Sequence, residues 1–285
     1  MDIRSYLSPY GIDTFGVLPL DECRLTRPYL LTREGFDLNK PLFVVVLAIP
    51  YLTPAADTPD RNLSAYAVSE DYHLCVRTML DDLLPRLRAD HPSHRFVGFA
   101  DHSPIDEIDA AVLAGLGVRG LNFLLLTERY SSYVFLGEIV TDLPLPSTRT
   151  SLPPEALRCH GCGACLRECP KAHAGGACLS ALTQKKGELT PSESEALTEF
   201  DSVWGCDVCQ EVCPYTYRAR SRGTIYSPIP FFHQATIPHL TPERLDAMSE
   251  QEFSRRAYAW RGRDTIRRNL LLKATHPSAS ENKEY

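Results

Sequence analysis

The decisive stretch of this chain is CHGCGACLRECP, residues 159–170. It spaces four cysteines by two, two and three residues and ends in a proline: Cys159, Cys162, Cys165 and Cys169, then Pro170. A second group follows downstream and also ends in a proline: Cys178, Cys206, Cys209 and Cys213, then Pro214. Thiols this close together and this regularly spaced indicate metal ligation or redox chemistry rather than disulfides.

This spacing is typical of bacterial ferredoxins with two [4Fe–4S] clusters. In such proteins the fourth cysteine of each motif binds the other cluster. The pattern therefore predicts one cluster on Cys159, Cys162, Cys165 and Cys213, and another on Cys169, Cys206, Cys209 and Cys178. Structural zinc also uses paired cysteines, but the x2–x2–x3–Cys–Pro spacing of the first group and the x2–x3–Cys–Pro spacing at the end of the second favour iron–sulfur clusters. Glycines beside the ligands allow close approach of the backbone: Gly161, Gly163 and Gly205.

Composition narrows the cellular setting and the partners. The 285 residues are 44% hydrophobic and 23% charged, as in ordinary globular proteins, with no apolar run long enough to span a membrane. The N-terminal residues lack a secretory signal, so we expect a cytoplasmic protein. A net charge of −6 argues against purely electrostatic nucleic-acid binding and leaves room for a local basic patch. Cys23 and Cys75 stand apart and are interpreted as ordinary buried thiols.

Apolar periodicity predicts the elements that precede the cysteines. Residues 42–49, LFVVVLAI, indicate a strand buried on both faces. Residues 70–88 have apolar side chains at helical spacing, and residues 95–100 indicate a second strand. A helix should follow, with Ser103 as its N-cap and Pro104 at its first position, and it should stop at one of two glycines, Gly115 or Gly117.

The remaining expectations concern the later part of the chain. Residues 122–127 and 133–140 are predicted strands, residues 144–155 form a proline-rich linker, and residues 248–274 form a last helix before a disordered tail. The predicted fold class is α/β (α+β), with a central, mostly antiparallel sheet flanked by helices and a ferredoxin-like domain. The predicted domains are a cofactor- and substrate-binding domain over residues 1–150, a two-cluster domain over 151–225 and a helical extension over 226–285.

Two places in the first 150 residues are candidates for catalytic or binding chemistry. Asp101 directly follows a predicted strand, where α/β sheets often present functional groups. From its position alone, capping the next helix is an alternative role. Tyr72 and His73 open the predicted helix, where His73 either binds a cofactor or lies on a solvated face.

Several segments, taken together and in order, resemble the cobalamin-dependent epoxyqueuosine reductases, a family related to the reductive dehalogenases. They include SAYAVSEDYH at 64–73, ADHSPIDE at 100–107, SYVFLGEIV at 132–140, WGCDVCQEVCP at 204–214 and RGRDTIRRNLLLKA at 261–274. The resemblance spans most of residues 40–275. Members often carry a further C-terminal helical-repeat domain, and the resemblance implies a short form that lacks it.

The resemblance implies an oxidoreductase that uses cobalamin, reduced by the two [4Fe–4S] clusters, to convert the epoxide of epoxyqueuosine in tRNA to queuosine. Asp101 takes the place of the family's proposed proton donor, and Tyr72, His73 and Ser103 become expected cofactor contacts. The expected partners are a tRNA anticodon loop and an external electron donor such as ferredoxin or flavodoxin, with no membrane partner.

The chain departs from the family pattern at positions where positive charge is usual. Ala65, Val68 and Glu70 replace family arginines, and Leu121 replaces a lysine. A cluster of arginines near the end could bind phosphates instead, or could belong to a solvated basic helix: Arg255, Arg256, Arg261, Arg263, Arg267 and Arg268. Two alternatives therefore stay open, a diverged corrinoid reductase with another substrate and an electron carrier of ferredoxin type.

Overall fold

The apolar run of residues 42–49 forms the centre of a four-stranded sheet in the computed structural model, which describes residues 1–170 and 176–275. The strands are β1 (Thr14–Pro19), β2 (Phe43–Pro50), β6 (Val134–Thr141) and β3 (Phe96–Phe99), in this spatial order. Every neighbouring pair is antiparallel. Both the buried strand and the antiparallel sheet are thus confirmed, whereas β1 had no counterpart among the predicted elements.

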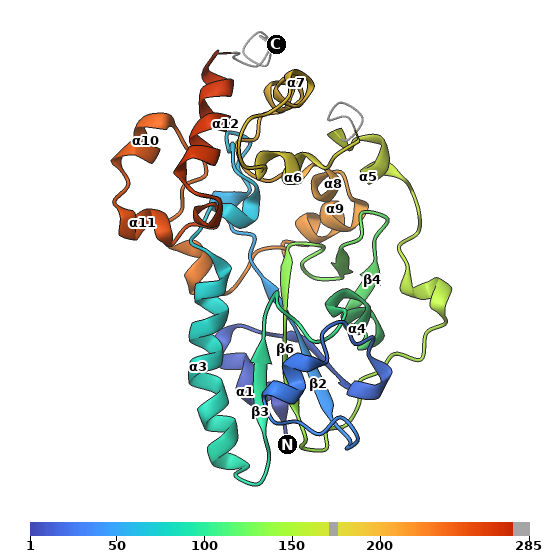
Figure 1. Ribbon diagram of the computed structural model, residues 1–285. Coiled ribbons are helices and arrows are strands. Elements are labelled where there is room, and N and C mark those ends of the chain that lie inside the picture. Colours follow the sequence, from blue (N-terminus) through green and yellow to red (C-terminus); the bar gives the residue numbers. More distant parts are fainter. Residues whose placement is uncertain (171–175, 276–285) are drawn as a thin grey trace. The chain divides into compact units, whose positions relative to one another are not determined.

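Helices cover both faces of this sheet (Figure 1). On one face, a Cβ added at Gly98 would lie 2.6 Å from the Leu80 side chain, so α3 (Tyr72–Asp90) packs closely there. On the other face, a Cβ at Gly16 would lie 2.7 Å from Ala114, directly after α4 (Glu107–Leu113). The register places Gly16, Val46, Glu138 and Phe99 in one row across the sheet, on the face toward α4.

The chain forms two compact units, and each is made of three separate segments. Unit 1 comprises Met1–Tyr51, His73–Gly163 and Pro214–Ile229; unit 2 comprises Leu52–Tyr72, Ala164–Cys213 and Pro230–Tyr285. Besides the sheet, α3 and α4, unit 1 contains α1 (Ile3–Leu7), η1 (Ser8–Tyr10), η2 (Leu20–Glu22), α2 (Tyr29–Arg33), β4 (Gly117–Arg119), β5 (Leu125–Thr127), η5 (Pro154–Leu157) and α9 (Pro214–Ser221). Strands β4 and β5 form a separate antiparallel pair.

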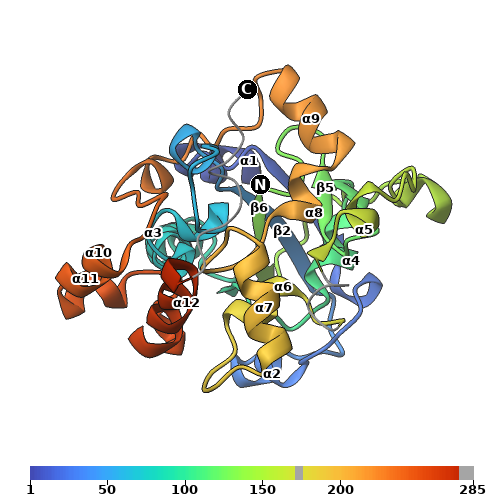
Figure 2. The same cartoon turned by 90° about the horizontal axis from the view of Figure 1, so that it is seen from above.

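Unit 2 consists of short helices around small apolar cores. Its elements are η3 (Pro54–Ala56), η4 (Ala65–Ala67), α5 (Ala164–Arg167), α6 (Leu179–Thr183), α7 (Pro191–Glu199), α8 (Val208–Glu211), η7 (Pro230–His233), α10 (Pro242–Ala247), α11 (Glu250–Ser254), η8 (Ala259–Arg261) and α12 (Arg263–Thr275). Helices α6, α7 and α12 pack together (Figure 2). Trp204 is fully buried and meets the ring of Tyr258 edge-on, at 6.2 Å between centroids.

The helix after β3 begins later than the sequence indicated. The N-cap is Asp106, whose side chain accepts from the amide of Asp109, so the prediction of Ser103 as N-cap is wrong. Residues before Asp106 are held in an extended conformation, because Ile105 forms a β-bridge with Leu25. The helix ends where expected, with Gly115 in the left-handed region at φ 82°.

Two other elements also differ from expectation. The predicted helix over 248–274 is divided into α11, η8 and α12, and Gly262 at φ 86° separates the last two. The predicted strand over 122–127 is confined to β5, because Phe123 lies in a turn with φ 63° and donates its amide to the Gly120 carbonyl. The predicted disordered tail over 277–285 lies outside the described residues.

Candidate iron–sulfur and active site

The first cysteine group follows η5, starts beside the end of β4 and turns at two glycines. The amide of Cys159 donates to the carbonyl of Arg119 at 2.9 Å, which attaches the start of the group to unit 1. Gly161 and Gly163 flank Cys162 with φ of 71° and 75°, a conformation that glycine adopts without a steric penalty. Short helix α5 then carries Cys165, and Cys169 follows it. The backbone therefore changes direction within a few residues, as thiolates that wrap one cluster require.

The second group is built on two short helices of unit 2. Cys178 is the N-cap residue of α6, Cys206 lies before α8, and Cys209 lies in α8, which packs against α5. Burial raises the pKa of the Cys206 thiol to about 11, with smaller electrostatic contributions from Asp207, Cys178 and Cys169. Three of the four thiols predicted for the second cluster are thus near neighbours.

The backbone beside Cys206 is tightly packed in unit 2. Gly205 has φ 76°, and a Cβ there would lie 2.4 Å from the Cβ of Ser64. The buried Asp207 carboxylate accepts hydrogen bonds from the Ser64 hydroxyl at 2.6 Å and the Ala65 amide at 2.7 Å, and it pairs with Arg61 at 2.9 Å. These contacts fix the cysteine-bearing loop to residues 61–65, far away in the sequence.

The chemistry of the eight thiols fits iron–sulfur ligation. Within the described residues, no three His, Cys, Asp or Glu side chains converge in the way a single metal ion would need. A [4Fe–4S] cluster has a different requirement, because each of its four thiolates binds a different iron. The number of thiols, eight, matches the need of two such clusters.

Asp101 occupies an exposed turn at the end of β3. Its φ is 62°, a region that non-glycine residues adopt uncommonly, and such positions cluster at functional sites. Its carboxylate lies 3.8 Å from Nε2 of His73, and the two side chains are 74% and 44% exposed. The alternative that Asp101 caps the next helix is wrong, since Asp106 does so.

The other predicted cofactor contacts lie in different environments. Tyr72 begins α3 and is half-buried, and His73 follows it on an exposed position. Ser103 is buried, and its hydroxyl accepts from the amide of Ile105 at 3.1 Å. The structure therefore brings His73 together with Asp101, and Ser103 is a buried residue of the same turn.

A pair of carboxyl groups near this turn was not predicted. Glu138, in β6, is completely buried, and Glu107 begins α4. Burial raises the pKa of Glu138 well above its ordinary value, and the neighbouring Glu107 adds to the shift. The signal in the sequence was a lone acidic residue inside an apolar strand, VFLGEIVT at 134–141.

Of the two isolated cysteines, Cys23 is buried, as predicted, and Cys75 is half-buried. Cys23 is buried and donates to the Pro19 carbonyl at 3.7 Å, and burial raises its pKa to about 12. Cys75 is half-buried, and burial raises its pKa to about 11. Both thiols are thus protonated and unreactive at neutral pH.

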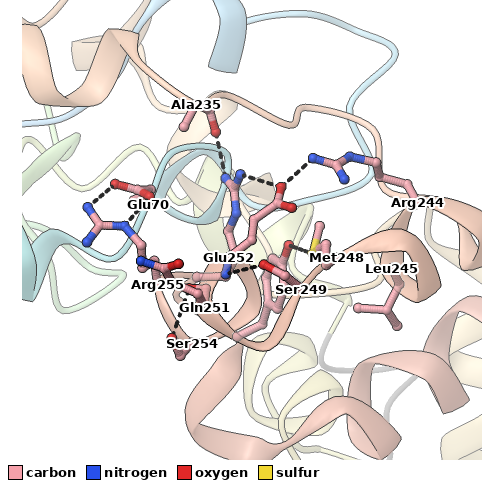
Figure 3. Close-up of polar contacts among 12 residues, drawn as sticks. Glu70, Ala235, Arg244, Leu245, Met248, Ser249, Gln251, Glu252, Ser254 and Arg255 are labelled. Carbon is pink, nitrogen blue, oxygen red and sulfur yellow. Dashed lines mark hydrogen bonds and ion pairs between the residues drawn. The ribbon is translucent and has the colours of Figure 1, made fainter.

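The arginine cluster near the C-terminus is largely engaged within unit 2. Arg255 makes a two-pronged ion pair with Glu70, with one nitrogen–oxygen distance of 2.6 Å, and it lowers the pKa of that carboxyl (Figure 3). Arg256 is buried and donates to the Ala235 carbonyl at 2.6 Å. The charge introduced at Glu70 is thus neutralised by one of the arginines considered for phosphate binding.

Three further arginines of the cluster also make contacts within unit 2. Arg263 donates to the Leu245 and Met248 carbonyls, Arg267 pairs with Asp246, and Arg268 donates to the Lys185 carbonyl at 2.8 Å. These guanidinium groups are not merely solvated, because they join segments of unit 2, and phosphate binding by the cluster stays a prediction.

An antiparallel α/β unit combined with a doubled ferredoxin-type cysteine motif defines an iron–sulfur redox protein. Residues 158–216 match the family model described as a 4Fe–4S double cluster binding domain, and residues 38–102 match the model described as Epoxyqueuosine reductase QueG, DUF1730.

Curated relatives and solved structures agree with this class. The chain is 32% identical over 236 residues to the epoxyqueuosine reductase of Gloeobacter violaceus, covering 79% of this chain and 71% of the relative. It is 28% identical to that of Listeria monocytogenes, covering 95% and 79%. A crystal structure of epoxyqueuosine reductase with a tRNA-Tyr epoxyqueuosine-modified stem loop matches with a TM-score of 0.71 and 25% identity, covering 98% and 82%. The chain belongs to the epoxyqueuosine reductase family.

The comparisons confirm the family, the fold class and the presence of a double-cluster domain. Within the described residues, no helix combines the length and the apolar character needed to cross a membrane.

Proposed function

We propose that this chain reduces the epoxide of epoxyqueuosine in a tRNA anticodon loop to the alkene of queuosine. The observation that carries the proposal is the sequence match along most of the chain to proteins named for this reaction. The solved relative with a modified tRNA stem loop supports the substrate class. Two electrons and two protons convert the epoxide to the alkene and one water.

The proposed cofactors are two [4Fe–4S] clusters and cobalamin. Cobalamin would supply a strongly reducing cobalt centre at the substrate, and the clusters would deliver its electrons one at a time. The ligand sets are those predicted from the motif: Cys159, Cys162, Cys165 and Cys213 for one cluster, and Cys169, Cys178, Cys206 and Cys209 for the other. An external donor such as ferredoxin or flavodoxin would reload them.

Asp101 would donate a proton to the departing oxygen. Its exposed carboxyl at the end of β3 can approach a bound substrate, and a general acid must come within hydrogen-bond distance of the atom that it protonates. His73 lies beside it and, with Tyr72, is proposed to hold the cofactor or the substrate. Ser103 would contribute through the turn that it buries, where its hydroxyl fixes the amide of Ile105.

The deciding experiment combines cofactor binding with turnover. Cobalamin is titrated anaerobically into the cluster-reconstituted protein, and the cob(II)alamin signal is followed by electron paramagnetic resonance. An epoxide-bearing anticodon stem loop is then assayed for the alkene product. A stoichiometric change in the signal with product formation supports the proposal, whereas an unchanged signal at saturating cobalamin contradicts it.

A second candidate is a corrinoid iron–sulfur reductase that acts on a substrate without phosphates. The Glu70–Arg255 pair favours it, because both charges of the pair are used within the protein. Leu121, which is 40% exposed, stands where the family has a lysine. Cobalamin binding without product from the stem loop would indicate this alternative.

A further inference from the structure

Glu138 is an acidic side chain placed inside an apolar layer. It stands in β6 opposite Val46 on one side and Phe99 on the other, and all three side chains face α4. Val46 and Phe99 belong to the apolar core between the sheet and α4, and Glu138 is completely buried. An ionised carboxylate in such a position is costly unless it is paired with a cation.

The neighbouring group with the largest influence on the pKa of Glu138 is another carboxyl, that of Glu107, and not a cation. Three buried oxygens of the pair have no hydrogen bond of good geometry within the described part of the chain: Oε1 of Glu107 and both carboxyl oxygens of Glu138. The Ser103 hydroxyl is near enough to lower the pKa of Glu138, but burial and Glu107 outweigh it. A proton carried by the carboxyls themselves would supply the missing donor.

The remaining charged groups around the pair leave this conclusion unchanged. Burial raises the pKa of Glu107 most, the neighbouring Glu138 carboxyl lowers it, Asp101 and Asp106 raise it, and Arg27 lowers it by the smallest amount. Arg24 is engaged by Asp106. The Cys23 thiol, which is also near Glu138, is protonated at neutral pH. Two adjacent carboxyls that face mostly negative neighbours cannot both ionise, as in other buried carboxyl pairs.

The pair lies under the turn that carries Asp101. This turn, residues 101–106 (the Asp101 loop), runs from β3 to the N-cap of α4. The loop is held by the amides of Thr26 and Arg27, which donate to the Pro104 carbonyl. It adjoins the carboxyl pair through Ser103, whose hydroxyl acts on Glu138, and through Glu107 directly after the loop.

We propose that Glu107 and Glu138 share one proton at neutral pH and thereby position the Asp101 loop for proton donation. Glu107 and Glu138 act through Asp101, so they are positioning residues. When the shared proton is lost, two buried negative charges repel each other beneath the loop, and the loop is released. The role assigned to Asp101 rests on the proposed function, whereas the effect of the pair on the loop does not.

Hydrogen exchange of the protein without cobalamin or RNA tests the positioning directly. The hydrogen-bonded amides of His102, Ile105 and Asp106 are followed between pH 6 and pH 9, after correction for intrinsic exchange. In the wild type, protection should fall once the shared proton titrates, by up to about tenfold per pH unit. In Glu138→Gln, whose amide can donate permanently to Glu107, most of this pH dependence should disappear.

Two further variants complete the design. Glu107→Gln removes the other half of the pair from a less buried position and should give the same flat profile, so the test does not depend on the folding of Glu138→Gln alone. Glu128→Gln changes a side chain that is 83% exposed and should behave as the wild type. Identical pH dependence in the wild type, Glu138→Gln and Glu107→Gln would overturn the proposal.

Turnover separates this inference from the proposed function. The alkaline limb of the kcat profile for the stem loop should move to higher pH in Glu138→Gln. Turnover with the same alkaline limb and the same exchange profile in all variants would contradict the positioning role. The expected exchange profiles without turnover in any variant would support the positioning and would count against the proposed function only.

Discussion

Single side chains determine what the turn after β3 can do. Asp101 combines a left-handed backbone with an exposed carboxyl beside His73, and this combination is unusual for a residue whose only role is structural. Its position after an apolar strand was visible in the sequence. Its conformation and the His73 contact were not, because they depend on residues that lie 28 positions apart in the chain.

Replacing Asp101 should separate chemistry from electron supply. Asp101→Ala should lower kcat for the stem loop by roughly 10²- to 10⁴-fold, the usual contribution of a general acid. The absorbance of the clusters and the binding of cobalamin should stay as in the wild type, because the side chain is exposed. Asp101→Asn, which keeps the shape but carries no acidic proton, serves as the matched control and should be equally slow. Full activity in either variant would exclude Asp101 as the proton donor.

The buried carboxyl pair should also make stability depend on pH. The folded state holds a proton that an unfolded glutamate, with a pKa of about 4.3, releases. The free energy of unfolding should therefore fall as the pH rises above this value toward the raised pKa, by at most about 1.4 kcal/mol per pH unit for one proton. Denaturant unfolding at several pH values checks this, and Glu138→Gln should flatten the slope in that range.

At the scale of elements, close contact between helices and the sheet explains the glycines at position 16 of β1 and position 98 of β3. The obstacle at Gly16 includes the backbone carbonyl of Ala114, which cannot move without shifting the end of α4. The obstacle at Gly98 is the flexible end of the Leu80 side chain, which can change rotamer. The same substitution should therefore have different costs at the two sites.

This contrast is testable by thermal or denaturant unfolding. Gly16→Ala should destabilise unit 1 by about 1–3 kcal/mol, the usual cost of overpacking a close contact. Gly98→Ala, in the same sheet, should cost less than Gly16→Ala. Equal costs would show that α4 adapts as easily as a side chain.

The sequence predicted those elements whose signals are local. The apolar run became β2, the periodic apolar residues became α3, and Gly115 ended α4. The errors arose where contacts between residues distant in sequence determine the structure. The bridge between Ile105 and Leu25 keeps Ile105 extended, so the helix begins only after Asp106. The acidic residue inside an apolar strand was a local signal for Glu138, but its pairing with Glu107 was not visible, because Glu107 lies on another element.

At the scale of the whole molecule, the two cysteine motifs depend on each other. If the fourth cysteine of each motif binds the other cluster, Cys159→Ser and Cys213→Ser should damage the same cluster, and Cys178→Ser and Cys206→Ser should damage the second. Iron content should fall from about eight to about four per chain in each variant. Paramagnetic resonance of the reduced proteins should give one residual spectrum within each pair. If Cys213→Ser gave the same residual spectrum as Cys206→Ser and not as Cys159→Ser, the ligand sets would be contradicted.

The division of each unit into three segments has a consequence for biosynthesis. Residues 52–72 leave the ribosome early, yet their partners in unit 2 lie between residues 164 and 285. Asn62 illustrates the delay, because its side chain is paired with the backbone of Leu240. Unit 1 likewise cannot complete its fold before residues 214–229 have been synthesised. Neither unit can therefore finish folding before these later segments are synthesised, and a cluster held by Cys213 cannot be completed before that cysteine is made.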